Sequence, residues 1–81
     1  MEIFQKGETA YYHEMGAMLK VEVLESTAEG DFVDYRLMVT EILRDSSWKN
    51  VSFKIGQEFE CTDNEQFKTS PLKAFRMSRN L

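Results

Sequence analysis

The stretch GDFVDYRLMVTEIL, residues 30–43, decides the fold class of this chain. Between Val33 and Val39 an apolar side chain stands at every second position, which is the period of a half-buried β-strand. The phase slips after Thr40, because Ile42 stands on the parity of the polar side chains. A β-bulge or sharp bend near Thr40 would restore the alternation, so the stretch predicts a long, bent strand.

Strand patterns recur on both sides of this stretch. Residues 19–23 alternate in the same way, and the Gly and Asp of STAEGD between the two runs predict a hairpin turn. Further on, the apolar side chains of residues 51–61 keep one parity, and Pro71 before the run 72–77 fits the entry to an edge strand. The pattern allows at most one short helical turn, around Asp63–Phe67.

The first 16 residues fit either a strand or a two-turn helix that begins after Thr9. An internal echo favours the strand. The segments Phe4–Glu8 and Phe53–Gln57 share the form F-x-x-G-[EQ], and each precedes an aromatic, strand-like run. In both, the glycine would allow a tight turn while the aromatic residue anchors it in the core, so we interpret them as two uses of one local device.

Five segments of the chain, taken in order, resemble the strand order of Src-homology-type small barrels, the Tudor/KOW-like group: FQKGETAYY, GAMLKVEVLES, DYRLMVTEIL, QEFECT and SPLKAF. The patterning and the resemblance together predict an all-β small barrel of five or six strands, a single domain over residues 1–81. The insert RDSSWKNVSFKIG departs from that group and carries a strand-like run of its own. An oligonucleotide/oligosaccharide-binding (OB) barrel therefore stays open as the alternative.

The size and composition of the chain limit what it can be. Its 81 residues, 42% of them hydrophobic, suffice for one small globular domain and exclude large catalytic architectures. The N-terminus lacks the apolar run of a signal peptide, and no stretch reaches the roughly 20 apolar residues of a membrane span. Cys61 is the only cysteine, whereas small secreted domains usually need disulfides. We expect a cytoplasmic protein with no membrane partner.

Charge is distributed unevenly along the chain. Residues 1–65 carry 14 acidic and 6 basic side chains, whereas residues 66–81 carry basic side chains and no acid. The acidic body disfavours broad contact with a phosphate backbone, so nucleic acid is not the expected partner. The residues that could still make a local contact with an anion are Lys68, Lys73, Arg76 and Arg79.

No catalytic, metal or cofactor site is predicted. His13-Glu14 is the only imidazole next to a carboxylate, and a helical metal motif would need a second histidine where Ala17 stands. Cys61 has acidic neighbours, the opposite of the electropositive setting that a thiolate nucleophile needs, and its strand parity places it in the core. The chain is therefore not expected to be an enzyme.

The resemblance also implies one kind of binding site, because Tudor-like barrels enclose cations with aromatic side chains at loop ends. The candidates for such a cage are the aromatic residues Tyr12, Phe32 and Trp48, with Asp31 or Asp34 as a source of negative charge. Alternatively, Trp48 covers an open end of the barrel and shields the core.

A second candidate surface lies on the strand GAMLKVEVLE, where Met18 and Leu24 take the face opposite the core-facing parity. Met38 and Ile42 of the neighbouring strand would widen this apolar patch. Two copies of the chain could bury it across a two-fold axis as a weak homodimer. Alternatively, the N-terminal 16 residues fold over the patch and the chain stays monomeric.

We therefore expect a non-catalytic interaction module that binds a protein partner or copies of itself. The first alternative is a nucleic-acid-binding barrel, which the fold resemblance suggests and the acidic body opposes. The second is a small-ligand-binding or catalytic subunit that acts at an oligomer interface.

Overall fold

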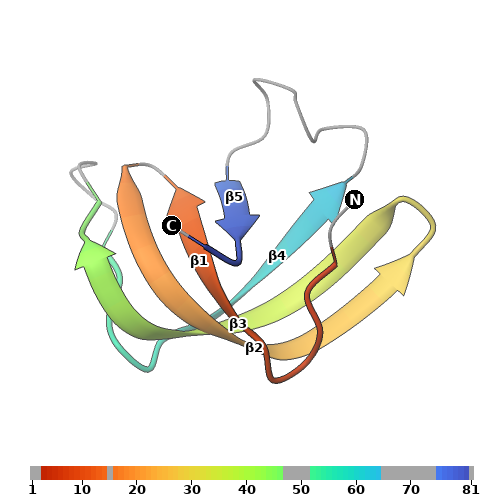
Figure 1. The fold of residues 1–81 in the computed structure, drawn as a ribbon, viewed down its shortest axis with the longest axis horizontal. Helices are drawn as coiled ribbons and strands as arrows, with labels where there is room; N and C mark the ends of the chain where they lie inside the picture. Colours follow the sequence, from red (N-terminus) through yellow and green to blue (C-terminus); the bar gives the residue numbers. More distant parts are fainter. Residues whose placement is uncertain (1–2, 15, 47–51, 65–74, 81) are drawn as a thin grey trace.

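The computed structural model describes residues 3–14, 16–46, 52–64 and 75–80 (Figure 1). These residues form one antiparallel sheet with the strand order β4-β3-β2-β1-β5, and they contain no helix. The predicted fold class, a small all-β structure, is confirmed. The strands are β1 (Thr9–Glu14), β2 (Ala17–Glu29), β3 (Phe32–Arg44), β4 (Glu58–Asn64) and β5 (Phe75–Ser78).

The long strands β2 and β3 form the central hairpin, as the sequence predicts. Their buried side chains alternate with more exposed ones, and Val21, Val23, Leu37 and Val39 have no exposed surface. These side chains line the inner, core-facing side of the sheet, and the side chains between them form its outer face. The first 16 residues contribute strand β1, so the strand alternative is correct there.

The β-bulge expected near Thr40 is present. Val21 pairs with Val39, but the next pair joins Lys20 to Glu41, so Thr40 is an extra residue on β3. The Thr40 hydroxyl donates a 3.1 Å hydrogen bond to the Lys20 carbonyl oxygen. The bulge returns Ile42 to the inner face, where it lies opposite Leu19 and packs against the core.

The predicted barrel is not closed. Figure 1 shows β2 and β3 curving like a cradle, with β1 and β5 rising on one side and β4 on the other. In the described part of the chain β4 and β5 are the two edges of an open sheet. Aromatic rings cross the inside of the cradle, because the Tyr12 ring lies 5.0 Å from that of Phe59 and 5.4 Å from that of Phe75, between ring centroids. Among the described residues, side chains rather than backbone pairing therefore hold the two sides together.

Several finer expectations differ from the structure. The strand-like run predicted across residues 51–55 is not a strand where it is described, because residues 52–57 form a loop and a turn. The expected helical turn begins at Asp63, which lies in β4, and its residues from 65 on fall outside the described part of the chain. The strands from β1 to β4 form a meander, unlike the Greek key of the OB alternative.

The repeated F-x-x-G-[EQ] segments form the same turn twice. In the first, the Gly7 amide donates to the Val23 carbonyl oxygen (2.8 Å) and the Val23 amide donates to the Glu8 carbonyl oxygen (2.9 Å). In the second, Gly56 and Gln57 make the same two bonds with Val39, at 2.7 and 2.9 Å. The expectation of one local device used twice is confirmed.

These two turns impose an approximate internal symmetry on the sheet. Each turn docks at the middle of a long strand and leads into a short strand that pairs with the first half of that long strand: β1 with β2, and β4 with β3. By this correspondence Tyr11 of β1 matches Glu60 of β4, and His13 matches Thr62. The outer edge of β1 is paired with β5, whereas no described strand pairs with the outer edge of β4.

Candidate functional site

Negative charge is concentrated on one half of the outer face. The carboxylates of Glu25, Asp34 and Glu60 border a shallow concavity of about 380 Å³, which we call the acidic groove. It runs from the second half of β2 across β3 to β4. The described residues that line it are Glu25, Thr27, Asp34, Tyr35, Arg36, Glu60, Cys61 and Thr62.

Among the described residues, Arg36 is the only cation that lines the groove, and two carboxylates hold it. Its Nε lies 3.0 Å from Glu58 Oε1, and its Nη1 lies 3.4 Å from Glu60 Oε1. The hydrogen bond to Glu58, which stands at the rim of the groove, raises the pKa of Arg36 above its usual value. Asp34 accepts a 2.6 Å hydrogen bond from the Thr62 hydroxyl. The described part of this site thus contains four carboxylates and one guanidinium, and the excess negative charge suits a cationic ligand.

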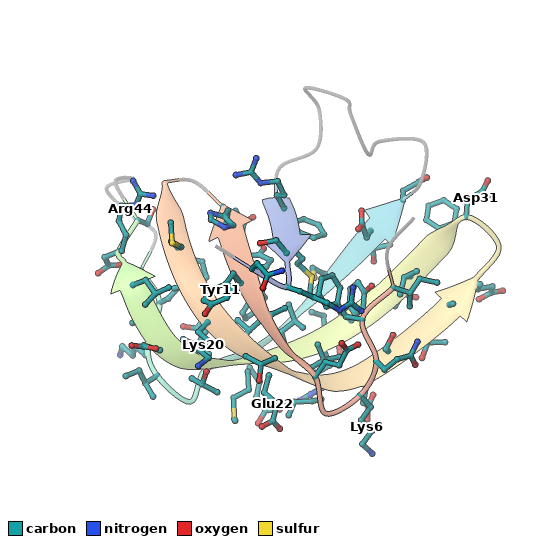
Figure 2. The ribbon with its side chains drawn as sticks, in the orientation of Figure 1. Lys6, Tyr11, Lys20, Glu22, Asp31 and Arg44 are labelled. Carbon is teal, nitrogen blue, oxygen red and sulfur yellow. The ribbon has the colours of Figure 1, made fainter. Side chains whose placement is uncertain are left out.

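An exposed aromatic ring extends this site toward the β2–β3 turn. Phe32 is 50% exposed and lines a second hollow of about 310 Å³ together with Glu29, Asp34 and Thr62. Phe32 and Asp34, two residues of the predicted cation cage, therefore share one surface. Asp31 stands next to Phe32 at the turn (Figure 2).

Tyr12 does not share the surface of Phe32 and Asp34, as the predicted cage requires. Tyr12 is only 2% exposed, since it lies on the inner face of β1 among the core side chains. Its hydroxyl donates to a Glu14 carboxylate oxygen, and burial raises the pKa of this tyrosine. Trp48 falls outside the described residues. The cage prediction was wrong for Tyr12 because consecutive tyrosines on a strand must face opposite sides, and Tyr11 is the one on the outer face.

Positive charge gathers at the opposite end of the outer face. Arg44 of β3, Met18 of β2, His13 of β1 and Arg76 of β5 lie side by side across four strands, and we call this set the basic row. Figure 2 shows Arg44 at the end of the cradle far from Asp31. Partial burial, followed by the nearby charges of Arg76 and Arg44, lowers the pKa of His13.

The candidates for contact with an anion have different environments. Arg76 belongs to the basic row and is exposed. Arg79 is occupied within the protein: its guanidinium donates to Glu8 and to the Ile3 carbonyl oxygen and lies 4.5 Å from the centroid of the Phe4 ring. Lys68 and Lys73 fall outside the described residues. The sequence did not reveal Arg44 as a member of the row, because only the strand register brings it beside Met18.

The predicted self-association patch is smaller than expected. Met18 and Met38 lie half-buried on the outer face, but Lys20 stands between them along β2. Leu24 is half-buried at a register shift between Val23 and Glu25. Ile42 was predicted on this face and is instead on the inner face, because of the Thr40 bulge.

The described residues contain no acid–base or metal constellation. His13 and Glu14 are neighbours on a strand and therefore face opposite sides of the sheet. No group of three or more metal-ligating side chains occurs in the described ranges. Cys61 packs half-buried against the core, as its parity predicts. None of the described segments is a helix long and apolar enough to cross a membrane.

No protein-family model matches the chain, and no curated protein or solved structure matches it either.

Proposed function

We propose that this chain is a non-catalytic interaction module whose acidic groove binds a basic segment of a partner protein. The observation that carries the proposal is the surplus of carboxylates at the groove: Glu25, Asp34 and Glu60 line it and Glu58 stands beside it, whereas Arg36 is the one cation among the described lining residues. Since Glu58 and Glu60 already share Arg36, a lysine or arginine of a partner would replace an intramolecular ion pair or add to it.

The overall strand plan supports the same class of function. The first four of the five resembling segments overlap the strands β1 to β4 in that order, which supports membership of the Src-homology-type small barrels. The fifth segment, SPLKAF, overlaps β5 only at Phe75, and its other residues lie outside the described part of the chain. Fold alone does not define a ligand, so the choice of a basic protein segment rests on the charges at the groove. A cytoplasmic location belongs to this proposal as well.

A titration with a synthetic peptide of alternating lysine and threonine tests the proposal. We expect the peptide to bind and its Kd to rise by about threefold in Glu60→Gln and by about tenfold in the Glu58→Gln/Glu60→Gln double variant, as exposed charge contacts are lost. Glu41→Gln is the matched control, because Glu41 is an exposed carboxylate of β3 near the other end of the outer face. Equal affinities for wild type and double variant would refute the role of the groove.

A nucleic acid is the second candidate ligand, and the basic row is the observation that favours it. The two guanidinium groups of the basic row, those of Arg44 and Arg76, offer positive charge to which a phosphate backbone could bind, while the acidic half of the same face opposes longer contacts. Titration with labelled single-stranded DNA and RNA at low salt tests this candidate. Affinity that falls steeply with salt and disappears in Arg76→Gln would support it, and absence of binding at low salt would exclude it.

A further inference from the structure

We propose that the basic segment binds as an additional β-strand, antiparallel to the outer edge of β4, with its basic side chains lying over the acidic groove. This inference rests on the proposed function and specifies how the partner is held. Three observations carry it: the direction of the β4 backbone groups, the internal symmetry of the sheet and the charge of the edge.

The backbone groups of β4 alternate in direction, and one set of them faces outward. The amide and carbonyl of Val39 both bond toward the turn that leads into β4. Because these directions alternate along a strand, Leu37 and Tyr35 also bond toward β4, where their partners are Phe59 and Cys61. The amides and carbonyls between these partners, those of Glu58, Glu60 and Thr62, therefore point to the outer edge. No described strand pairs with them.

The other half of the molecule shows how such an edge accepts a strand. On the outer edge of β1, β5 pairs antiparallel with Tyr11 opposite Ser78 and His13 opposite Arg76. The internal symmetry matches Tyr11 with Glu60 and His13 with Thr62. A strand added to β4 would thus reproduce an arrangement that this backbone already accommodates.

The charges of the edge select the occupant. In antiparallel pairing, residues opposite Glu58, Glu60 and Thr62 place their side chains on the outer face, beside the groove. Lysine or arginine at these alternate positions would meet the carboxylates of Glu58 and Glu60. Two copies of this chain paired edge to edge would instead bring two acidic edges together, which disfavours a second copy as the occupant. A basic, extended segment of another protein is therefore the partner that fits.

Backbone methylation of the lysine–threonine peptide tests the added strand separately from the charge contact. In the antiparallel arrangement the lysines lie opposite Glu58, Glu60 and Thr62, so their amides bond to β4 while the threonine amides point away. N-methylation of the central lysines should weaken binding by about tenfold or more, because it removes these bonds and adds bulk at the edge. N-methylation of the central threonines, with the same charge and size, should leave the affinity within about twofold.

The outcomes separate the two proposals. If both methylated peptides bind as well as the parent, or if the threonine form is weakened as much as the lysine form, the antiparallel strand is refuted while the charge contact stands. If the parent peptide does not bind at all, the proposed function fails, and the added strand fails with it.

Amide exchange provides a second readout on the protein side. With the parent peptide bound, the amide protons of Glu60 and Thr62 should exchange with solvent several times more slowly, because they become hydrogen-bonded. The amides of Phe59 and Cys61 are internal controls, since the strand register already directs them toward β3. Binding without slower exchange at Glu60 and Thr62 would overturn the added strand.

Discussion

Gly7 and Gly56 occupy the same place in the two matching turns, with φ angles of +91° and +89°. A Cβ added at either position would meet no atom of a described residue within 4 Å, the chain neighbours aside, so the backbone conformation is the reason for glycine there. The turns therefore depend on glycine for a purely local reason.

Replacing either glycine should destabilise the protein by a similar amount. We expect Gly7→Ala and Gly56→Ala each to lower the free energy of unfolding by about 1 kcal/mol, the cost of an L-residue in the left-handed region. Chemical denaturation followed by circular dichroism measures this change, with the exposed Ser52→Ala beside the second turn as a control. A change in Gly56→Ala no larger than that in Ser52→Ala would contradict the local explanation.

His13 should report the electrostatics of the basic row. Its pKa in the folded protein is lowered by partial burial and by the charges of Arg76 and Arg44, so the folded state prefers the neutral imidazole. The contribution of this group to stability is therefore present above the unfolded pKa, about 6.5, and is lost as the pH falls through the lower folded value.

Removing one neighbouring cation should raise the pKa of His13. Because His13 is the only histidine in the chain, a single imidazole signal in an NMR titration follows it. We expect Arg76→Gln to shift its midpoint upward and Arg36→Gln, at the acidic groove, to leave it unchanged. An unchanged midpoint in Arg76→Gln would show that the arginine does not act on this imidazole.

At the scale of the strand, the bulge at Thr40 determines which side chains of β3 reach the core. Two residues, Thr40 and Glu41, occupy the space of one opposite Lys20, so Val39 and Ile42 both face inward. Thr40 is thus an extra residue with no paired residue on β2, whereas the residues from Val33 to Val39 alternate regularly between the two faces.

Two single-residue deletions should therefore differ sharply. Deleting Thr40 leaves the inward and outward parities on both sides intact, and we expect a cooperatively folded protein with a lower thermal midpoint. Deleting Met38 should reverse the faces of one half of β3 and prevent folding. Far-ultraviolet circular dichroism during heating compares the two. Equal loss of structure in both variants would contradict this account of the bulge.

The face on which a strand residue lies was predicted correctly for most of β3 and wrongly for Ile42 and Tyr12. The alternation from Val33 to Val39 identified the core face of β3, and the slip at Ile42 indicated the bulge. The same bulge moves Ile42 out of the predicted outer patch. This follows once the extra residue at Thr40 is counted, because every later residue of β3 then changes face. The parity of Tyr12 was ambiguous, since either member of the pair Tyr11-Tyr12 could face inward.

Surface sites that combine several strands could not be predicted from alternation alone. Asp34 and Phe32 were recognised as candidates, but the groove also needs Glu25 and Glu60 from neighbouring strands. Their meeting depends on the register of three strands, and the bulges in β2 and β3 shift that register by single residues. The register is selected by side-chain contacts between neighbouring strands, and the sequence alone does not show which residues make these contacts.

For the whole molecule, the reduced outer patch bears on self-association. A weak homodimer is predicted from the sequence on four apolar side chains, of which Ile42 lies inside and Met18 and Met38 are separated by Lys20. The apolar area left for a two-fold contact is small against the cost of association. We therefore expect the chain to stay monomeric.

Sedimentation equilibrium tests this expectation. The mass should remain 9.5 kDa from about 10 to 300 μM, the range in which a weak dimer would form. A mass that rises with concentration and returns to the monomer value in Met18→Lys would restore the predicted dimer. A rise that Met18→Lys leaves unchanged would place the contact on a different surface.

The contact of Arg79 with Ile3 has a consequence for local opening of the fold. The Arg79 guanidinium reaches the Ile3 carbonyl oxygen at 3.0 Å and Glu8 Oε1 at 3.1 Å, so a side chain of the last described segment holds the first one. Segments that are far apart in the sequence are joined by these contacts, so a fluctuation that releases one of them should loosen the other as well.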